Sequence, residues 1–77
     1  MYSKRENIHI GQMIRTELKK QGRSVTWFAN AIHSDYSNVY KMFKRRSIDL
    51  DLLLRISDLL QHDFLRDVSD KMGQSSA

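Results

Sequence analysis

The sequence predicts a small all-α domain of five helices. Its 77 residues contain no proline and no cysteine, and leucine, lysine and arginine, which favour helices, are plentiful. Apolar residues recur at helical spacing in five segments, and each segment has a residue typical of a helix end beside it. A chain of this length has room for one domain with one core, which buries only about 60% of the unfolded surface.

The first helix is predicted from about His9 to Gln21, because apolar residues recur there on one side. Gly22 is well placed to end this helix in a left-handed turn. The apolar stripe, spaced i, i+3, i+4 and i+8, consists of Ile10, Met13, Ile14 and Leu18.

The second helix is predicted from Val25 to about Ile32, with the Ser24 hydroxyl as its N-cap. Trp27 is expected to be partly buried rather than to serve as a ligand platform. The inner face is formed by Phe28, Ala29 and Ile32. The small side chain of Ala29 allows a neighbouring helix to approach closely.

The third helix is predicted at about residues 36–45, after a tight turn at His33 and Ser34. The first turn residue often needs a positive φ, which His tolerates better than most residues. Asp35 is the expected N-cap, with a carboxylate that accepts from first-turn N–H groups. At 100° per residue, one side gathers Val39, Met42 and Phe43, and the other gathers Ser37, Tyr40, Lys41 and Lys44.

Two more helices are predicted after caps at Asp49 and Asp63. The apolar residues of the fifth are Phe64, Val68 and Met72, and those of the fourth are Leu50, Leu52, Leu53, Leu54, Ile56, Leu59 and Leu60. The leucines cover more than one side of the fourth helix. Two explanations stay open: a central helix packed by several neighbours, or a surface shared with a second copy of the chain.

The domain is predicted to span residues 9–72, between a flexible N-terminal arm at residues 1–8 and a loose tail at residues 73–77. The arm has no periodic apolar pattern, which favours a frayed terminus. Its basic residues, Lys4 and Arg5, leave open an arm that reaches into a DNA groove.

Charge is distributed asymmetrically. Residues 1–46 hold ten Lys and Arg against three Asp and Glu, a balance of +7, whereas residues 47–77 hold three against six, a balance of −3. A basic half gives the molecule a face for polyanions. No apolar run is long enough to span a membrane, and the absence of cysteine fits a reducing cytoplasm.

Enzymatic activity is not expected. The sequence has no cysteine nucleophile, no cluster of histidines with carboxylates, and no glycine-rich phosphate loop. The three histidines, His9, His33 and His62, lack the spacing of metal ligands, so neither a metal nor another cofactor is predicted.

The exposed side of the third helix suits the major groove of DNA, because it offers hydroxyls, aromatic rings and lysines to an anionic partner with readable edges. Lys44, Arg45 and Arg46 follow at its end, where a phosphate backbone can lie. Taken alone, such a run is more often a solvated face.

Two short helices joined by a tight turn, with helices around them, form a helix-turn-helix domain. Over roughly residues 10–68 the chain resembles the Cro/repressor (Xre-type) family, a lambda-repressor-like fold. The matching positions are Ser24, Phe28-Ala29, His33, Asp35, Val39, Phe43 and the fourth-helix leucines. The chain departs from the family pattern at three places: His33 replaces the turn glycine, Val25 replaces a frequent Gln, and Arg45 or Arg46 replaces the glycine after the recognition helix.

The resemblance implies base contacts from Tyr36, Ser37 and Lys41, and the helical period adds Tyr40 and Lys44. It implies phosphate contacts from Arg23, Ser24, Asn38, Arg45 and Arg46. At Ser24 the contact would come from backbone N–H groups at a helix N-terminus.

The expected function is therefore that of a sequence-specific transcriptional regulator that binds double-stranded DNA as a homodimer in a bacterial or phage cytoplasm, associated with the nucleoid. The alternative is an antitoxin or anti-repressor on the same fold. In that case the leucines and the acidic half would hold a protein partner.

Overall fold

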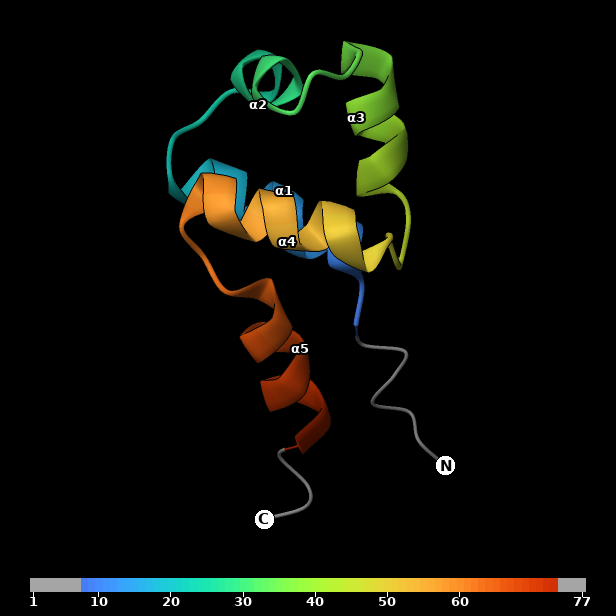
Figure 1. Cartoon of the computed structure of the whole chain (residues 1–77), viewed down its shortest axis with the longest axis vertical. Coiled ribbons are helices and arrows are strands. Elements are labelled where there is room, and N and C mark those ends of the chain that lie inside the picture. Colours follow the sequence, from blue (N-terminus) through green and yellow to red (C-terminus); the bar gives the residue numbers. More distant parts are fainter. Residues whose placement is uncertain (1–7, 74–77) are drawn as a thin grey trace.

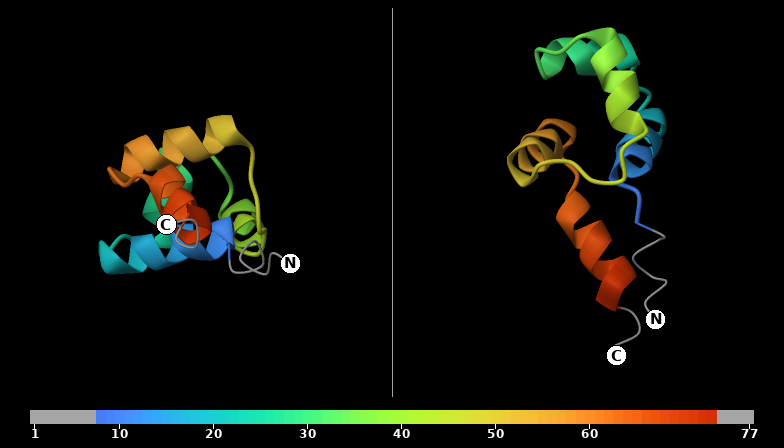
Figure 2. Two further views of the ribbon diagram at one scale, coloured as in Figure 1. Left: turned by 90° about the horizontal axis from the view of Figure 1, so that it is seen from below. Right: turned by 90° about the vertical axis from the view of Figure 1, so that its right-hand side faces the viewer.

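The computed structural model describes residues 8–73, which form five helices and no strand. The helices are α1 (Ile10–Lys20), α2 (Val25–Ala31), α3 (Tyr36–Phe43), α4 (Leu50–Leu60) and α5 (Phe64–Gly73). Helices α2 and α3 form one end of the molecule, α1 and α4 lie in the middle, and α5 forms the other end (Figures 1 and 2). The predicted all-α class is confirmed, and the arrangement is consistent with a small helix-turn-helix fold.

Side-chain caps begin four of the helices. Ser24, Asp49 and Asp63 each accept a hydrogen bond at the start of their helix, as predicted. The donors are the N–H groups of Trp27, Leu52 and Arg66, at 3.0 Å in each case. His9 Nδ1 accepts from the Gln12 N–H at 3.2 Å, so a histidine caps α1.

Three helices end at a residue in the left-handed conformation: Gly22 (φ 70°), His33 (φ 56°) and Gln61 (φ 53°). After each of them, the next N–H group donates to a carbonyl five residues earlier; after His33 this bond runs from Ser34 N to Ala29 O at 2.9 Å. This is the Schellman pattern, which satisfies carbonyls at a helix end. The turns predicted at Gly22 and His33 are confirmed, whereas sequence reasoning missed Gln61.

The core draws on all five helices. Its largest fully buried side chains are Phe28, Phe64, Ile14, Ile56 and Val39. The rings of Phe28 and Phe43 stack with centroids 6.4 Å apart, and this contact joins α2 to α3. The predicted inner faces are confirmed at Ile14 and Phe28, while Met13 and Ile32 at their margins are half-buried.

Helices α4 and α5 leave part of their apolar surface uncovered. On α4, Leu53, Ile56 and Leu60 are buried, but Leu50 and Leu54 are 58% and 46% exposed. On α5, Phe64 is buried and Val68 half-buried, and the far end of the stripe, Met72, is 51% exposed. The described part of one chain, residues 8–73, therefore leaves some of these leucines uncovered.

Helix α1 approaches the end of α3 at Gly11. The N–H groups of Ile10 and Gly11 donate to the carbonyl oxygens of Arg46 and Arg45, both at 3.0 Å. A Cβ added at Gly11 would collide with the carbonyl oxygens of Met42 and Phe43. Only glycine allows this approach, which fixes the end of α3 against α1.

Replacing Gly11 by alanine is expected to destabilise the fold by about 1–3 kcal/mol, because the colliding atoms belong to the backbone and cannot rotate away. Urea denaturation followed by circular dichroism measures the change. The matched control is Gln12→Ala, whose exposed side chain should contribute less than about 0.5 kcal/mol. Equal urea midpoints for the two variants would contradict the close approach.

The two termini lie outside the described residues, at 1–7 and 74–77, and with them the basic residues of the predicted arm and most of the predicted tail. Ile8, the last residue assigned to the arm, is half-buried against the core. Gly73, the first residue assigned to the tail, is the last residue of α5.

Candidate nucleic-acid interface

The ten predicted contact residues lie on α3, at the start of α2 and in the loop after α3, and all ten are exposed. The opposite side of α3 is buried through Val39, Met42 and Phe43, as its periodicity predicts. Because α3 packs against both α1 and α2, its outer side chains are presented on a supported helix at one end of the molecule (Figure 1).

Two details of the predicted α3 are wrong. The helix ends at Phe43 rather than at residue 45, so Lys44 is its C-cap and Arg45 lies in the following loop. Asp35 has the extended backbone of an N-cap, but its side chain forms no cap hydrogen bond. The two errors have different origins. The helix ends early because the Arg45 carbonyl accepts a hydrogen bond from the Gly11 N–H of α1, and this tertiary contact holds the chain after Phe43. The Asp35 carboxylate is exposed to solvent and does not accept from the first-turn N–H groups.

The exposed surface of α3 divides into two parts. Asn38 and Lys41, three residues apart on α3, line a hollow together with Arg45 of the following loop and the start of α4. Tyr36 and Tyr40 contact each other away from that hollow. The base contacts predicted at Tyr40 and Lys41 therefore lie on neighbouring strips of the helix.

The two tyrosines form a defined pair. Their rings meet edge to face with centroids 5.1 Å apart, and their hydroxyl oxygens lie 3.5 Å apart. This hydrogen bond to Tyr40 raises the pKa of Tyr36 above its ordinary value of 10.0, so the phenol stays neutral at physiological pH. Tyr40 also meets the Phe43 ring edge to face at 5.8 Å, which ties the pair to the core. A neutral hydroxyl can both donate to and accept from a base edge.

The start of α2 carries a cation held on an aromatic face. The Arg23 guanidinium carbon lies 4.3 Å from the centroid of the Trp27 ring, a cation–π contact. Trp27 is half-buried, as predicted, and its backbone N–H is taken by the Ser24 hydroxyl. The stacking holds the Arg23 charge beside the helix N-terminus, where a phosphate would be favoured.

Arg45 and Arg46 are positioned by their backbones. Their carbonyls accept the α1 hydrogen bonds described above, so the loop that carries both cations is fixed to the body of the domain. Sequence reasoning missed the glycine that makes this contact possible. It also gave no role to Arg15, whose guanidinium lies 5.9 Å from the centroid of the Phe43 ring and adds a cation beside α3.

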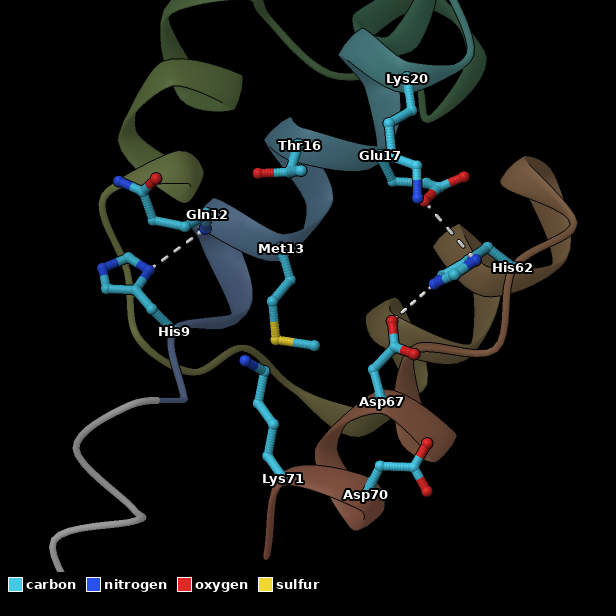
Figure 3. A pocket seen from close by; sticks show the side chains of 10 residues that line it. All are labelled: His9, Gln12, Met13, Thr16, Glu17, Lys20, His62, Asp67, Asp70 and Lys71. Carbon is cyan, nitrogen blue, oxygen red and sulfur yellow. Dashed lines mark hydrogen bonds and ion pairs between the residues drawn. The ribbon is translucent and has the colours of Figure 1, made fainter.

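A second cluster, centred on His62, joins α5 to α1 (Figure 3). His62 Nε2 lies 2.6 Å from Asp67 Oδ2, and Nδ1 lies 3.6 Å from Glu17 Oε1. Gln21 Nε2 donates to Glu17 and to the Leu60 carbonyl, each at 2.8 Å. The cluster borders a cavity of about 480 Å³ and joins α1 to the end of α4 and the start of α5, which are distant from α1 in the sequence. No sequence pattern pointed to it.

Residues 8–73 contain no group of three or more His, Asp or Glu that could hold a metal ion. None of the helices in this range is long and apolar enough to cross a membrane. Comparison of the chain with protein-family models, with curated proteins and with solved structures gives no match. The assignment of a function therefore rests on the residues and geometry described above.

Proposed function

We propose that the protein is a sequence-specific transcriptional regulator that places α3 in the major groove of double-stranded DNA. The main observation in support is that α3 has one buried side and one exposed polar side. One side is buried against α1 and α2, and the opposite side exposes only hydroxyl, amide and cationic side chains together with the tyrosine pair. The resemblance of the sequence to the Cro/repressor family supports the same function at the level of the fold.

In this proposal base edges are read by the middle of α3. Lys41 can donate to guanine O6 and N7, and Ser37, one turn earlier on the exposed side, can donate to or accept from several bases. The hydroxyls of Tyr36 and Tyr40 add two more groups that can contact base edges, and Lys44 at the end of the helix adds a third. The fixed geometry of α3 would hold these groups in one register along the groove.

Phosphates are proposed to lie on either side of α3. Arg23, stacked on Trp27, and the N-terminus of α2 at Ser24 would meet one strand. Arg45 and Arg46 would meet phosphates beyond the end of α3, with Asn38 between these two regions. Such contacts set the register and supply affinity that does not depend on sequence.

A homodimer is part of the proposal, because Leu50 and Leu54 of α4 and Met72 of α5 remain exposed. Burial of such side chains against a second copy would remove apolar surface from water and place two copies of α3 about one helical turn apart on the DNA. Regulators of this type act on the cytoplasmic nucleoid of a bacterium or on phage DNA.

Selection of bound sequences from random duplex DNA tests the proposal, because it reports binding, specificity and half-site spacing together. The expected product is a pseudo-palindrome with half-sites about 10 base pairs apart, and sedimentation should show a dimer at micromolar concentration. An unenriched pool would overturn the proposed function. An enriched single half-site, together with a monomer at all concentrations, would overturn only the dimer.

A partner-binding protein, such as an antitoxin or anti-repressor, is the second candidate. It is favoured by the exposed apolar side chains on the acidic half of the chain, where Leu65 of α5 joins those of α4. Co-purification of a second, different chain at fixed stoichiometry from the native host would support this candidate. Both roles can reside in one protein.

A further inference from the structure

A hollow of about 430 Å³ lies between α3, the turn before it and the start of α4. This volume falls within the roughly 300–1,000 Å³ of small-molecule sites. The hollow is separate from the cavity beside His62, and the two share no lining residue.

The floor of the hollow is apolar. Val39 and Met42 of α3 are buried beneath it, and Ile32, Ile48 and Leu52 are half-buried around them. Three half-buried aliphatic side chains from different segments thus converge on one concave surface. Such a surface gains by burying the apolar body of a ligand.

The rim of the hollow is cationic on the α3 side. Lys41, in the last turn of α3, and Arg45, in the loop after it, both border the hollow, and neither forms an ion pair with another described residue. The Asn38 amide adds a further donor beside them. A carboxylate bound here would accept charge-assisted hydrogen bonds, which are stronger than neutral ones.

One carboxylate also borders the hollow, that of Asp49. Its Oδ2 accepts from the Leu52 N–H at 3.0 Å as the N-cap of α4, so the helix dipole partly offsets its charge. His33, whose backbone has the left-handed turn conformation, also lines the hollow. The charge balance around the opening remains positive through Lys41 and Arg45.

We infer that this hollow is an effector site for a small amphipathic anion, a carboxylate with a short aliphatic or aromatic body. The body would lie on Ile32, Ile48 and Leu52, and the carboxylate would lie between Lys41 and Arg45. Because these two cations belong to the proposed DNA-contacting surface, a bound anion would neutralise them and weaken DNA binding. The regulatory part of the inference rests on the proposed function, whereas the site itself does not.

Titration with octanoate, followed by methyl NMR in the absence of DNA, tests the site. Saturable chemical-shift changes are expected for the methyl groups of Ile32, Ile48 and Leu52. The dissociation constant should lie in the millimolar range, because the binding free energy of a ligand with about ten heavy atoms is small. Octanamide, which lacks the charge, and acetate, which lacks the apolar body, should each bind at least about tenfold more weakly.

Arg45→Gln should weaken octanoate binding about tenfold, and Arg66→Gln, the same change on the exposed surface of α5, should leave it unaltered. No saturable shifts, equal affinity for octanamide, or equal weakening by both variants would overturn the site.

A competition experiment separates the site from the proposed function. Octanoate at saturating concentration should weaken binding to the selected duplex at least fivefold, and acetate at equal ionic strength should not. If octanoate binds in the hollow and DNA binds independently of it, the regulatory inference is wrong. If octanoate binds and the protein binds no duplex at all, the proposed function fails and the site stands.

Discussion

Replacing Phe28 by alanine is expected to remove about 3–5 kcal/mol of stability, because the ring is fully buried and stacks on Phe43 across the contact between α2 and α3. A 77-residue domain has roughly 4–12 kcal/mol in total at the usual stability per residue. The variant should therefore be largely unfolded or close to it. Urea denaturation followed by circular dichroism measures the loss.

The matched control is Tyr36→Ala, which removes an aromatic ring that is 53% exposed on α3. This change should cost less than about 1 kcal/mol, since its contacts are with the exposed Tyr40 rather than with the core. If both variants had the wild-type urea midpoint, the stacked pair would not hold α2 on α3, and the support proposed for the recognition helix would be wrong.

Raising the salt concentration from 50 to 200 mM is expected to weaken duplex binding by wild-type protein about 40-fold. Three exposed cations are proposed phosphate contacts: Arg23, Arg45 and Arg46. Each neutralised phosphate adds about 0.9 to the slope of log K against log salt, so three give a slope of about −2.7. Fluorescence anisotropy of a labelled duplex at several salt concentrations measures this slope.

The expected slope becomes shallower by about 0.9 in Arg45→Ala, for the selected duplex and for a random one alike, because a phosphate contact carries no sequence information. Arg66→Ala, which removes a cation from α5, the helix at the opposite end of the molecule from α3, should keep the wild-type slope (Figure 1). A slope near zero for wild-type protein would exclude nucleic acid as the partner.

Local chemistry explains what the sequence could predict. The caps at Ser24, Asp49 and Asp63 and the turns at Gly22 and His33 depend on one residue and its near neighbours, and the structure confirms all five. The apolar sides of α1, α2 and α3 follow from helical periodicity in the same way.

Contacts between distant segments explain what sequence reasoning missed. Gly11 has no local signature, yet it sets where α1 meets the end of α3, and so where the helix stops. The bridge from His62 to Glu17 joins residues that only the tertiary fold brings together. The hollow beside Lys41 arises in the same way, because α3, the turn before it and α4 form its walls together.

The leucines of α4 show what an apolar sequence pattern does not predict, namely which of the side chains are buried in the core. Their number predicted either several neighbours or a shared surface, and the structure buries Leu53 and Leu60 while leaving Leu50 and Leu54 exposed. A sequence shows that apolar area is present, but its distribution among core, solvent and partner depends on the packing of the other helices.

Lys41→Ala distinguishes the reading of base edges by α3 from binding of the DNA backbone alone. The affinities of this variant and of wild-type protein should be compared on the selected duplex and on each of its single-base variants. Because Lys41 is exposed and lies outside the core, the variant should fold as the wild type does. The variant should lose about 1–3 kcal/mol of binding free energy at one base-pair position only, where it should no longer prefer one base over another. An equal loss on every duplex would make Lys41 a phosphate contact and contradict the proposed placement of α3 in the groove.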